Sequence, residues 1–423
     1  MAGSCQEVYA PNAIVTAYDA YDLTAKVFNY KGDQTYDVTR NWVIETFNAP
    51  ELTEIGYRVF LNSTVKTVNA PKLKTVKAWA FANCQNLEKF DLNNLEYLDT
   101  SAFASCPNFK DIVINNNKDV TLARFTSNYP NPGQISIDYN TFSVTANNIY
   151  LKANDESNSY NYVNANINAK NIILKADTLK FEGAVCNSGA ESVTLDARLI
   201  TTDAYCSGII ADGLDNTFNL KTINYNVEEI ENNANLFYDP NQSELTLNRV
   251  NITYNIGARV KELPRVVKGD LRQPIEAGDF TPIKAVVFDE NSKITTIKAY
   301  NLSYIMATSI TLPASVTAVE NYAFAYSKLQ TLNMDNCTNI DISSASVYNC
   351  EDYQFELANN VYYFGETAVK LDKNASGDVA LRAGTKYISN INYKGFLADV
   401  TNNVNLILLD SFVAFKTIKS DNL

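Results

Sequence analysis

The 423-residue sequence contains no histidine. Serine-protease triads, cysteine–histidine dyads and histidine-ligated zinc sites all need an imidazole, so each of these sites is excluded. No cysteine stands in a C-x-x-C pair, so nothing supports a structural zinc site or a thioredoxin-type redox centre. We therefore expect no metal, no cofactor and no catalytic centre, and we expect that the protein is not an enzyme.

Other sequence features that are scarce or absent bear on which partners the protein binds and where it is located. The net charge is −12 and the pI is about 4.7, so a nucleic-acid partner is disfavoured. No apolar run reaches the length of about 18 residues that a membrane-spanning helix needs. Residues 1–5 lack the charged and apolar regions of a signal peptide, so we expect no signal peptide in this chain.

The most informative pattern that is present is a repeat of 21 to 22 residues. The frame Phe47-Asn48-Ala49-Pro50 returns as Val68-Asn69-Ala70-Pro71, and a related frame begins at Phe90. A period of this length is typical of stacked coils, because each coil cannot bury its apolar face without its neighbours.

Within each coil, apolar residues follow the leucine-rich repeat pattern L-x-x-L-x-L. It is visible at residues 87–92, 109–114 and 329–334. Its alternation has the period of a β-strand with every second side chain inside. We predict an α/β fold: a leucine-rich-repeat solenoid of roughly fifteen coils, with a parallel β-sheet on one face and short helices or irregular turns on the other. The phenylalanines expected at matching buried places are Phe60, Phe81, Phe103 and Phe324.

Two segments carry a more specific signature. Residues 80–87 read Ala-Phe-Ala-Asn-Cys-Gln-Asn-Leu, and residues 102–109 read Ala-Phe-Ala-Ser-Cys-Pro-Asn-Phe. This signature, found again around Phe324 with Ser327 in the cysteine place, resembles the BspA-like leucine-rich repeats of bacterial and protist surface proteins. The resemblance covers residues 44–117 and 283–357. It implies a secreted or surface-displayed adhesion or interaction protein, located outside the cell or at its surface, rather than an enzyme.

The pattern also suggests how the chain is divided. We expect an N-terminal capping segment over residues 1–43, whose tyrosines cover the open end of the first coil. A repeat block follows over residues 44–262 and is irregular in its middle. Prolines and glycines cluster over residues 263–282, which predicts an irregular connection. A second repeat block with a C-terminal cap then spans residues 283–423.

Side chains that alternate outward on the predicted strands define a ligand-binding face. Its candidate residues are Lys89, Asp91, Asp111, Val113, Thr311, Thr331 and Asn333. Each predicted strand has one central residue whose side chain points outward, and among these central residues only Asp91 and Glu356 are acidic. At about 4.8 Å per coil they would lie some 55 Å apart, whereas the carboxylates of a glycosidase lie about 5–9.5 Å apart. The row therefore holds no catalytic carboxylate pair.

The seven cysteines allow possible disulfides without fixing any. Cys84 and Cys106 occupy equivalent places in successive coils, at a separation near the lower limit for a disulfide. The alternative is two buried free thiols, which we favour because cysteine is among the most buried residues even when free. The other possible pairs are Cys186 with Cys206 and Cys337 with Cys350.

Asn-x-Ser/Thr sequons give possible glycosylation sites, although an Asn- and Thr-rich sequence also produces sequons by chance. The candidates are Asn62, Asn241, Asn251, Asn301 and Asn374. A sixth sequon at Asn336 adjoins Cys337, whose side chain we expect to turn inward, so Asn336 is not among the candidates.

The aromatic content favours binding. Tyrosine (26 residues) far exceeds tryptophan (2 residues), and tyrosine offers a large amphipathic contact area. We predict a non-enzymatic secreted or cell-surface recognition or adhesion protein, whose partners are host or matrix proteins or glycans. The alternative is a self-assembling extracellular structural protein, which forms fibres or a sheath by head-to-tail contact of the solenoid ends.

Overall fold

The computed structural model describes residues 4–10, 24–30, 43–123, 139–152, 167, 169–182, 190–202, 208–211, 220–231, 235–238, 251–266, 283–338, 340–342, 344–365, 367–372, 377–385, 387–388 and 404–407. The chain forms two compact units, unit 1 (Met1–Val250) and unit 2 (Asn251–Leu423). The segment bounds predicted at residues 43, 262 and 282 stay predictions.

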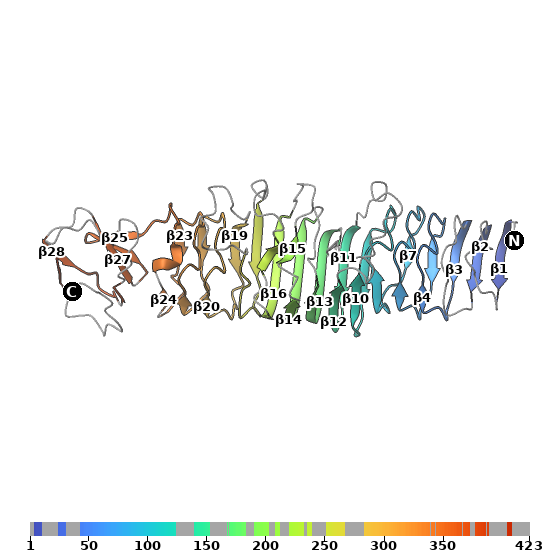
Figure 1. Cartoon of the computed structure of the whole chain (residues 1–423), viewed down its shortest axis with the longest axis horizontal. Coiled ribbons are helices and arrows are strands. Elements are labelled where there is room, and N and C mark those ends of the chain that lie inside the picture. The colour runs from blue at the N-terminus through green and yellow to red at the C-terminus, as the bar shows by residue number, and fades with distance from the viewer. Residues whose placement is uncertain are drawn as a thin grey trace, which may run out of the picture. The chain divides into compact units, whose positions relative to one another are not determined.

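Unit 1 is built of parallel strands in two rows. The first row contains β1 (Ser4–Ala10), β2 (Thr24–Tyr30), β3 (Val43–Asn48), β5 (Thr67–Asn69) and β7 (Lys89–Phe90), paired in that order, and continues with the pair β9 (Asp111–Asn115) and β11 (Tyr139–Thr145). The second row contains β4 (Glu54–Ile55), β6 (Thr75–Val76), β8 (Tyr97–Asp99), β10 (Val120–Ala123) and β12 (Asn148–Lys152). Figure 1 shows these strands side by side, from β1 in blue to the green strands.

Three strands of unit 1 are long enough to belong to both rows. They are β13 (Ala169–Phe181), β14 (Ser192–Thr202) and β16 (Thr222–Ile230). The first half of β13 pairs with β11 and its second half with β12. Strands β11 and β12 therefore belong to one coil. A further pair is β15 (Gly208–Ala211) with β17 (Asn235–Tyr238).

Unit 2 repeats the two rows with shorter strands and ends in an antiparallel sheet. Its first row contains the pair β18 (Ile252–Ile256) and β19 (Ile283–Phe288) and the pair β21 (Ser309–Thr311) and β23 (Thr331–Asn333); its second row contains β20 (Thr296–Ile297), β22 (Ala318–Val319) and β24 (Asp341–Ile342). The antiparallel strands are β25 (Glu356–Ala358), β26 (Val361–Phe364) and β27 (Thr367–Leu371). The remaining strands are β29 (Tyr387–Ile388), which pairs with β27, and the pair β28 (Gly377–Ala380) and β30 (Val404–Ile407).

A third row in each unit consists of turns. This turn row comprises residues 57–62, 78–83 and 100–105 in unit 1 and residues 300–304, 322–326 and 345–349 in unit 2. Its backbone amides bond to the next coil, because Phe60 N donates to Ala80 O at 2.7 Å and Phe81 N donates to Ala102 O at 2.8 Å. These bonds between coils take the place of the i to i−4 bonds of a helix.

The expectation of an α/β fold is wrong in its helical part. Within the residues described, the only helix is a short 3₁₀ turn, η3 (Ser344–Val347), and the rest of the regular structure is strand. The returning half of a coil is short, and its backbone groups are already paired with the neighbouring coils. The prediction of parallel strands stacked side by side is confirmed, for example by the register Thr46–Thr67 and Thr311–Asn333.

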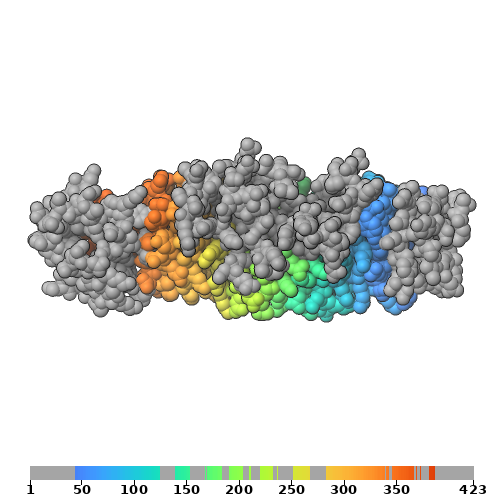
Figure 2. Space-filling view, viewed as in Figure 1, coloured from blue at the N-terminus to red at the C-terminus, as the bar shows by residue number. Residues whose placement is uncertain are grey.

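The core of each unit is a column of inward side chains. Phe60, Phe81 and Phe103 are at most 1% exposed, and their rings stack at centroid distances of 4.8 and 5.3 Å. Phe324 is fully buried at the matching place in unit 2. The predicted register of these four phenylalanines is confirmed. Figure 2 shows successive coils as bands across one face, coloured along the chain.

Exposed ion pairs also join neighbouring coils. The amino groups of Lys118 and Lys74 lie 2.9 and 3.3 Å from the Glu96 carboxylate. The hydrogen bond from Lys118, with a smaller contribution from Lys74, lowers the pKa of Glu96. Exposed pairs contribute only about 0–1 kcal/mol. They therefore add little to the stability of the stacked coils.

Candidate functional site

The predicted ligand-binding face is solvent-exposed at all of its positions. The exposed residues are Lys89, Asp91, Asp111, Val113, Thr311, Thr331 and Asn333. In unit 2, Thr311 lies beside Asn333 across the β21–β23 pair, and Thr331 follows the same row. In unit 1, Asp111 and Val113 lie on β9, and the Val113 side chain is 50% exposed. Each unit thus presents its own part of this strand row.

The middle of unit 1 extends this row with side chains that were not among the predicted site residues. From Val113 on β9 the row continues through Ser143 on β11, Ile173 on β13 and Thr194 on β14. On β16, the Asn224 amide donates to the Thr194 hydroxyl at 3.1 Å and the Asn226 amide donates to the Asp196 carboxylate at 3.0 Å. These bonds across strands hold the side chains in a regular array.

Glu356 is not part of this row. It lies on the antiparallel strand β25, where its carboxylate contacts the Arg382 guanidinium at 2.5 Å. Its predicted place in the strand row is wrong because the parallel pairing gives way to a hairpin there. Asp91 remains exposed, next to the end of β7.

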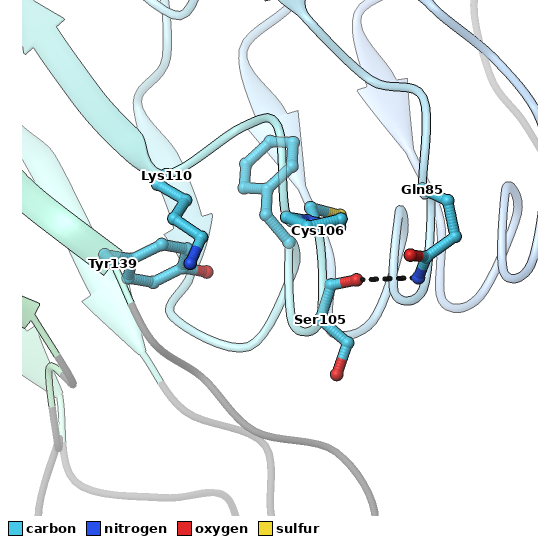
Figure 3. Close-up of a pocket in the computed structure, with 7 residues that line it drawn as sticks. Gln85, Ser105, Cys106, Lys110 and Tyr139 are labelled. Atoms are coloured by element: carbon cyan, nitrogen blue, oxygen red, sulfur yellow. Dashed lines mark hydrogen bonds between the residues drawn. The ribbon is translucent and has the colours of Figure 1, made fainter.

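A small hollow opens at the end of the turn row of unit 1. Its volume is about 240 Å³, and its lining includes Gln85, Ser105, Cys106, Lys110 and Tyr139. Figure 3 shows Lys110 close to Tyr139 on one side, and the Gln85 amide donating to the Ser105 carbonyl at 3.3 Å on the other. The volume falls below the roughly 300–1,000 Å³ of small-molecule sites, so the hollow is a weak candidate.

The turn row carries a more informative feature, namely two columns of residues with left-handed backbone. In unit 1 these residues are Arg58, Trp79, Asn62, Asn83 and Ser105; in unit 2 they are Tyr300, Tyr322, Tyr304, Tyr326 and Asn349. Their φ angles range from 54° to 66°. Left-handed backbone costs an L-residue about 1–2 kcal/mol, and asparagine tolerates it better than bulky residues do.

The two units fill equivalent turn positions with different chemistry. Asn62 and Asn83 form an amide ladder in unit 1, in which the Asn83 amide donates to the Asn62 carbonyl oxygen at 2.7 Å. The matching column of unit 2 contains Tyr304 and Tyr326. The turn therefore requires left-handed backbone but does not require tyrosine. Tyrosines that persist in an unfavourable conformation point to a role beyond the fold.

The tyrosines of unit 2 form one contact group, the tyrosine cluster, which consists of Tyr300, Tyr304, Tyr322, Tyr326 and Tyr348. Tyr300 stacks on Tyr322 with centroids 5.6 Å apart, and Tyr304 stacks on Tyr326 at 4.9 Å; the interplanar angles are 4° and 1°. Tyr348 meets both Tyr322 and Tyr326 edge to face, at 5.3 and 5.5 Å. Tyr304 is buried, and the other four rings are half-buried.

Two tyrosines of the cluster have raised pKa values. Burial, followed by the neighbouring tyrosines, raises the pKa of Tyr300 and of Tyr326. Tyr326 also shares side-chain hydrogen bonds with Asn349 and Tyr348. At the other end of the cluster, the Arg265 guanidinium lies 6.0 Å from the Tyr300 ring centroid. The hydroxyls of Tyr300 and Tyr326 therefore stay protonated in neutral and mildly alkaline solution.

Sequence reasoning missed this cluster and drew attention to tyrosines near the N-terminus instead. Tyr18, Tyr21 and Tyr36 lie outside the described residues, and only the backbone is described for Tyr9 and Tyr30. A usable signal was present as Tyr-x-x-x-Tyr at residues 300–304, repeated 22 residues later. Unit 1 has Trp79 and Asn83 at the same offsets.

The cysteines that are described carry free thiols, so the possible Cys84–Cys106 and Cys337–Cys350 disulfides are absent. The Cys84 thiol donates to Phe60 O at 2.9 Å, the Cys106 thiol donates to Phe81 O at 3.0 Å, and the Cys350 thiol donates to Phe324 O at 3.0 Å. Each thiol therefore bonds to the carbonyl of the phenylalanine one coil earlier. Cys186 and Cys206 lie outside the described residues.

We expect Cys84 and Cys350 to resist alkylation in the folded protein. Burial raises the pKa of both thiols, so little thiolate is available at about pH 8. Iodoacetamide labelling followed by peptide mass spectrometry should modify the half-buried Cys337 first, and the other two only after guanidinium is added. A Cys84–Cys106 disulfide in protein purified without reductant would contradict this assignment.

The sequons differ in accessibility. Asn62 and Asn251 are exposed, whereas Asn301 is 3% exposed. The Asn301 amide donates to Leu263 O at 2.9 Å, and its side-chain oxygen accepts from Lys298 N at 2.8 Å. A glycan on Asn301 is incompatible with these bonds, so we withdraw this candidate. Asn241 and Asn374 lie outside the described residues.

Two further observations bear on the partners. Among the described residues, no group of three or more Cys, Asp or Glu side chains is placed to ligate a metal ion. In the same part of the chain, no helix is both long and apolar enough to cross a membrane.

Comparison with solved structures gives two remote likenesses. One is a leucine-rich repeat protein from Bacteroides ovatus, with 11% identity over 95% of this chain and 91% of that chain and a TM-score of 0.29. The other is a leucine rich cell surface protein from Faecalibacterium prausnitzii, with 16% identity over 83% of this chain and 87% of that chain and a TM-score of 0.24. These TM-scores are too low to support an argument about this chain. No curated protein matches it.

The family comparison agrees with the repeat geometry. The model of the BspA type leucine rich repeat region matches six copies, over residues 39–131 and 273–376. These stretches contain the stacked Phe81 and Phe103 of unit 1 and the buried Phe324 of unit 2. The chain therefore carries leucine-rich repeats of the BspA type in both of its compact units.

Proposed function

We propose that the protein is a non-enzymatic recognition protein of the cell surface or extracellular space, which binds proteins or glycans through its repeat surface. The exposed strand row supports this proposal. Each coil contributes a few outward side chains, and stacking makes them contiguous, so that a large ligand meets many weak contacts at once. The row is mixed in charge and largely polar.

Arginine substitutions in unit 2 test this proposal. Thr311→Arg and Asn333→Arg each place a long side chain at an exposed position of the strand row, so we expect at least tenfold weaker binding because the added bulk blocks contact with the row. Binding to immobilised collagen and mucin, measured by surface plasmon resonance, reports the change. Circular dichroism should show an unchanged fold, because both side chains face solvent.

The matched control is Thr317→Arg. Thr317 is also exposed, but it precedes the second-row strand β22 rather than lying in the first row. It should bind like the wild type. The proposal fails if neither collagen nor mucin is bound, or if both first-row variants bind as strongly as the control.

Assembly is the second candidate function, and one observation favours it. Strand β1 pairs with β2 on one side, and in the described part of the chain no strand pairs with its other side. A free edge of 7 residues is a template for another chain. Negative-stain electron microscopy separates the two functions, because filaments at physiological salt would favour assembly and dispersed particles would favour recognition.

A further inference from the structure

The tyrosine cluster exposes ring edges rather than ring faces. Tyr300 and Tyr322 cover each other's faces, as do Tyr304 and Tyr326, because both pairs are nearly parallel. The outer ends of the stacks are closed by Arg265 near Tyr300 and by Tyr348 against Tyr322 and Tyr326. A ligand therefore meets the rims of the rings and their hydroxyl groups.

The hydroxyl groups recur with the period of the coils. The stacked rings are 5.6 and 4.9 Å apart, which is close to the spacing of neighbouring strands. A linear ligand that lies along the stack would meet a phenol at each step, and this step is comparable to the length of one hexose unit. A phenol hydroxyl both donates and accepts hydrogen bonds, as a sugar hydroxyl does. The Tyr326 hydroxyl already shares hydrogen bonds with Asn349 and Tyr348.

The composition of the cluster favours a carbohydrate over a protein. Every ring of the cluster is half-buried or buried, so the cluster offers a ligand hydroxyl groups and ring edges rather than a broad apolar area. Among the described residues of unit 2, the large apolar side chains that are exposed are Val287 and Leu357, which lie on strands outside the turn row.

The charges of the protein also indicate which class of carbohydrate would bind. The cluster consists of tyrosines, and the Arg265 guanidinium lies 6.0 Å from the Tyr300 ring centroid. The chain as a whole carries a net charge of −12, which repels anionic polymers. Sulfated and sialylated chains are therefore disfavoured.

We propose that the tyrosine cluster is a subsite for a neutral linear oligosaccharide, whose hydroxyl groups bond to the phenols of Tyr300, Tyr322, Tyr326 and Tyr348. Tyr304 supports Tyr326 from within the unit. The proposal rests on the proposed function, because it names one class of partner for the repeat surface, and it assigns that partner to the turn row rather than to the strand row.

Phenylalanine substitutions test the role of the hydroxyls. Tyr322→Phe and Tyr326→Phe keep the rings and their stacking and remove only the hydroxyl groups. We expect the intact chain to bind cellohexaose, mannohexaose or xylohexaose, and each variant to bind about tenfold more weakly, as for the loss of one hydrogen bond. Isothermal titration calorimetry measures the affinities. Tyr57→Phe, in the turn row of unit 1, is the matched control and should bind like the wild type.

Asparagine variants provide a second readout. Tyr326→Asn introduces the residue that unit 1 carries at the matching positions Asn62 and Asn83, and Tyr322→Asn places the same residue at the position that matches Trp79; the backbone is left-handed at all of these positions. These variants should fold, because asparagine accepts this conformation, and they should lose measurable binding to the hexasaccharide. Thr311→Arg in the strand row should leave that binding unchanged.

Three outcomes would overturn the inference: no hexasaccharide binds, the phenylalanine variants bind as well as the wild type, or a proline-rich peptide binds the cluster in place of the sugar. A different result would contradict the proposed function, namely that both first-row variants bind collagen and mucin as strongly as the control does. The two failures are therefore distinguishable.

Discussion

Replacing Phe81 with alanine should lower the free energy of unfolding of unit 1 by about 3–5 kcal/mol. The ring is fully buried, stacks on Phe60 and Phe103 at 4.8 and 5.3 Å, and meets Phe90 edge to face at 5.1 Å. Alanine would remove these contacts and leave a cavity that stacked coils cannot close, because their spacing is fixed by hydrogen bonds between strands.

The loss should be concentrated in the neighbouring coils. In a repeat stack each coil contacts mainly its neighbours, so hydrogen exchange should speed up in residues 60–103 and remain slow in β13 and β14. Urea unfolding followed by circular dichroism gives the overall change. Lys89→Ala, on the exposed strand row, is the control and should change the stability by less than about 0.5 kcal/mol. A loss below about 1 kcal/mol for Phe81→Ala would contradict the proposed core column.

The sequence predicted the parts of the fold that depend on burial. The spacing of Phe60, Phe81 and Phe103 is set by the length of one coil, so the pattern contains the register directly. The first-row strands followed from the alternation of apolar residues, as at β9 and β23. An inward side chain at a fixed period leaves a clear signal because a polar residue there would be costly.

The sequence predicts the conformation of the returning half of each coil less clearly. A short helix and a stacked turn both place one apolar side chain inside, so Ala80-Phe81-Ala82 suits either. The difference lies in the backbone partners, since Phe81 N bonds to Ala102 O in the next coil rather than within its own turn. The left-handed backbone at Tyr322 and Tyr326 was hidden for the same reason, because tyrosine is not a residue that predicts it.

Site prediction met a similar limit. Outward positions of the strand row could be read from the period of two, and Thr311 and Asn333 do lie side by side. The tyrosine cluster depends instead on contacts between coils that differ from one another, because Tyr348 takes the place that Ala325 has one coil earlier. A pattern that is common to all coils does not show such differences between individual coils.

Replacing Asn301 with alanine should lower the free energy of unfolding of unit 2 by about 2–4 kcal/mol, because it leaves two buried backbone groups without their partners. The Asn301 amide donates to Leu263 O at 2.9 Å, and its oxygen accepts from Lys298 N at 2.8 Å. The side chain thus joins the turn at residues 298–301 to the segment before it. Neither bond can be remade by alanine, and the 3% exposure leaves little access for water.

Asn251→Ala is the matched control, since Asn251 belongs to another sequon and is exposed. It should change the stability by less than about 0.5 kcal/mol. Thermal and urea unfolding of both variants measure the difference, and expression in a glycosylating host adds an independent check. Asn301 should remain unmodified in folded protein because its amide is already engaged in the turn. An unchanged unfolding midpoint for Asn301→Ala, or a glycan found on Asn301, would show that the side chain faces solvent and that the coil register around Leu302 is incorrect.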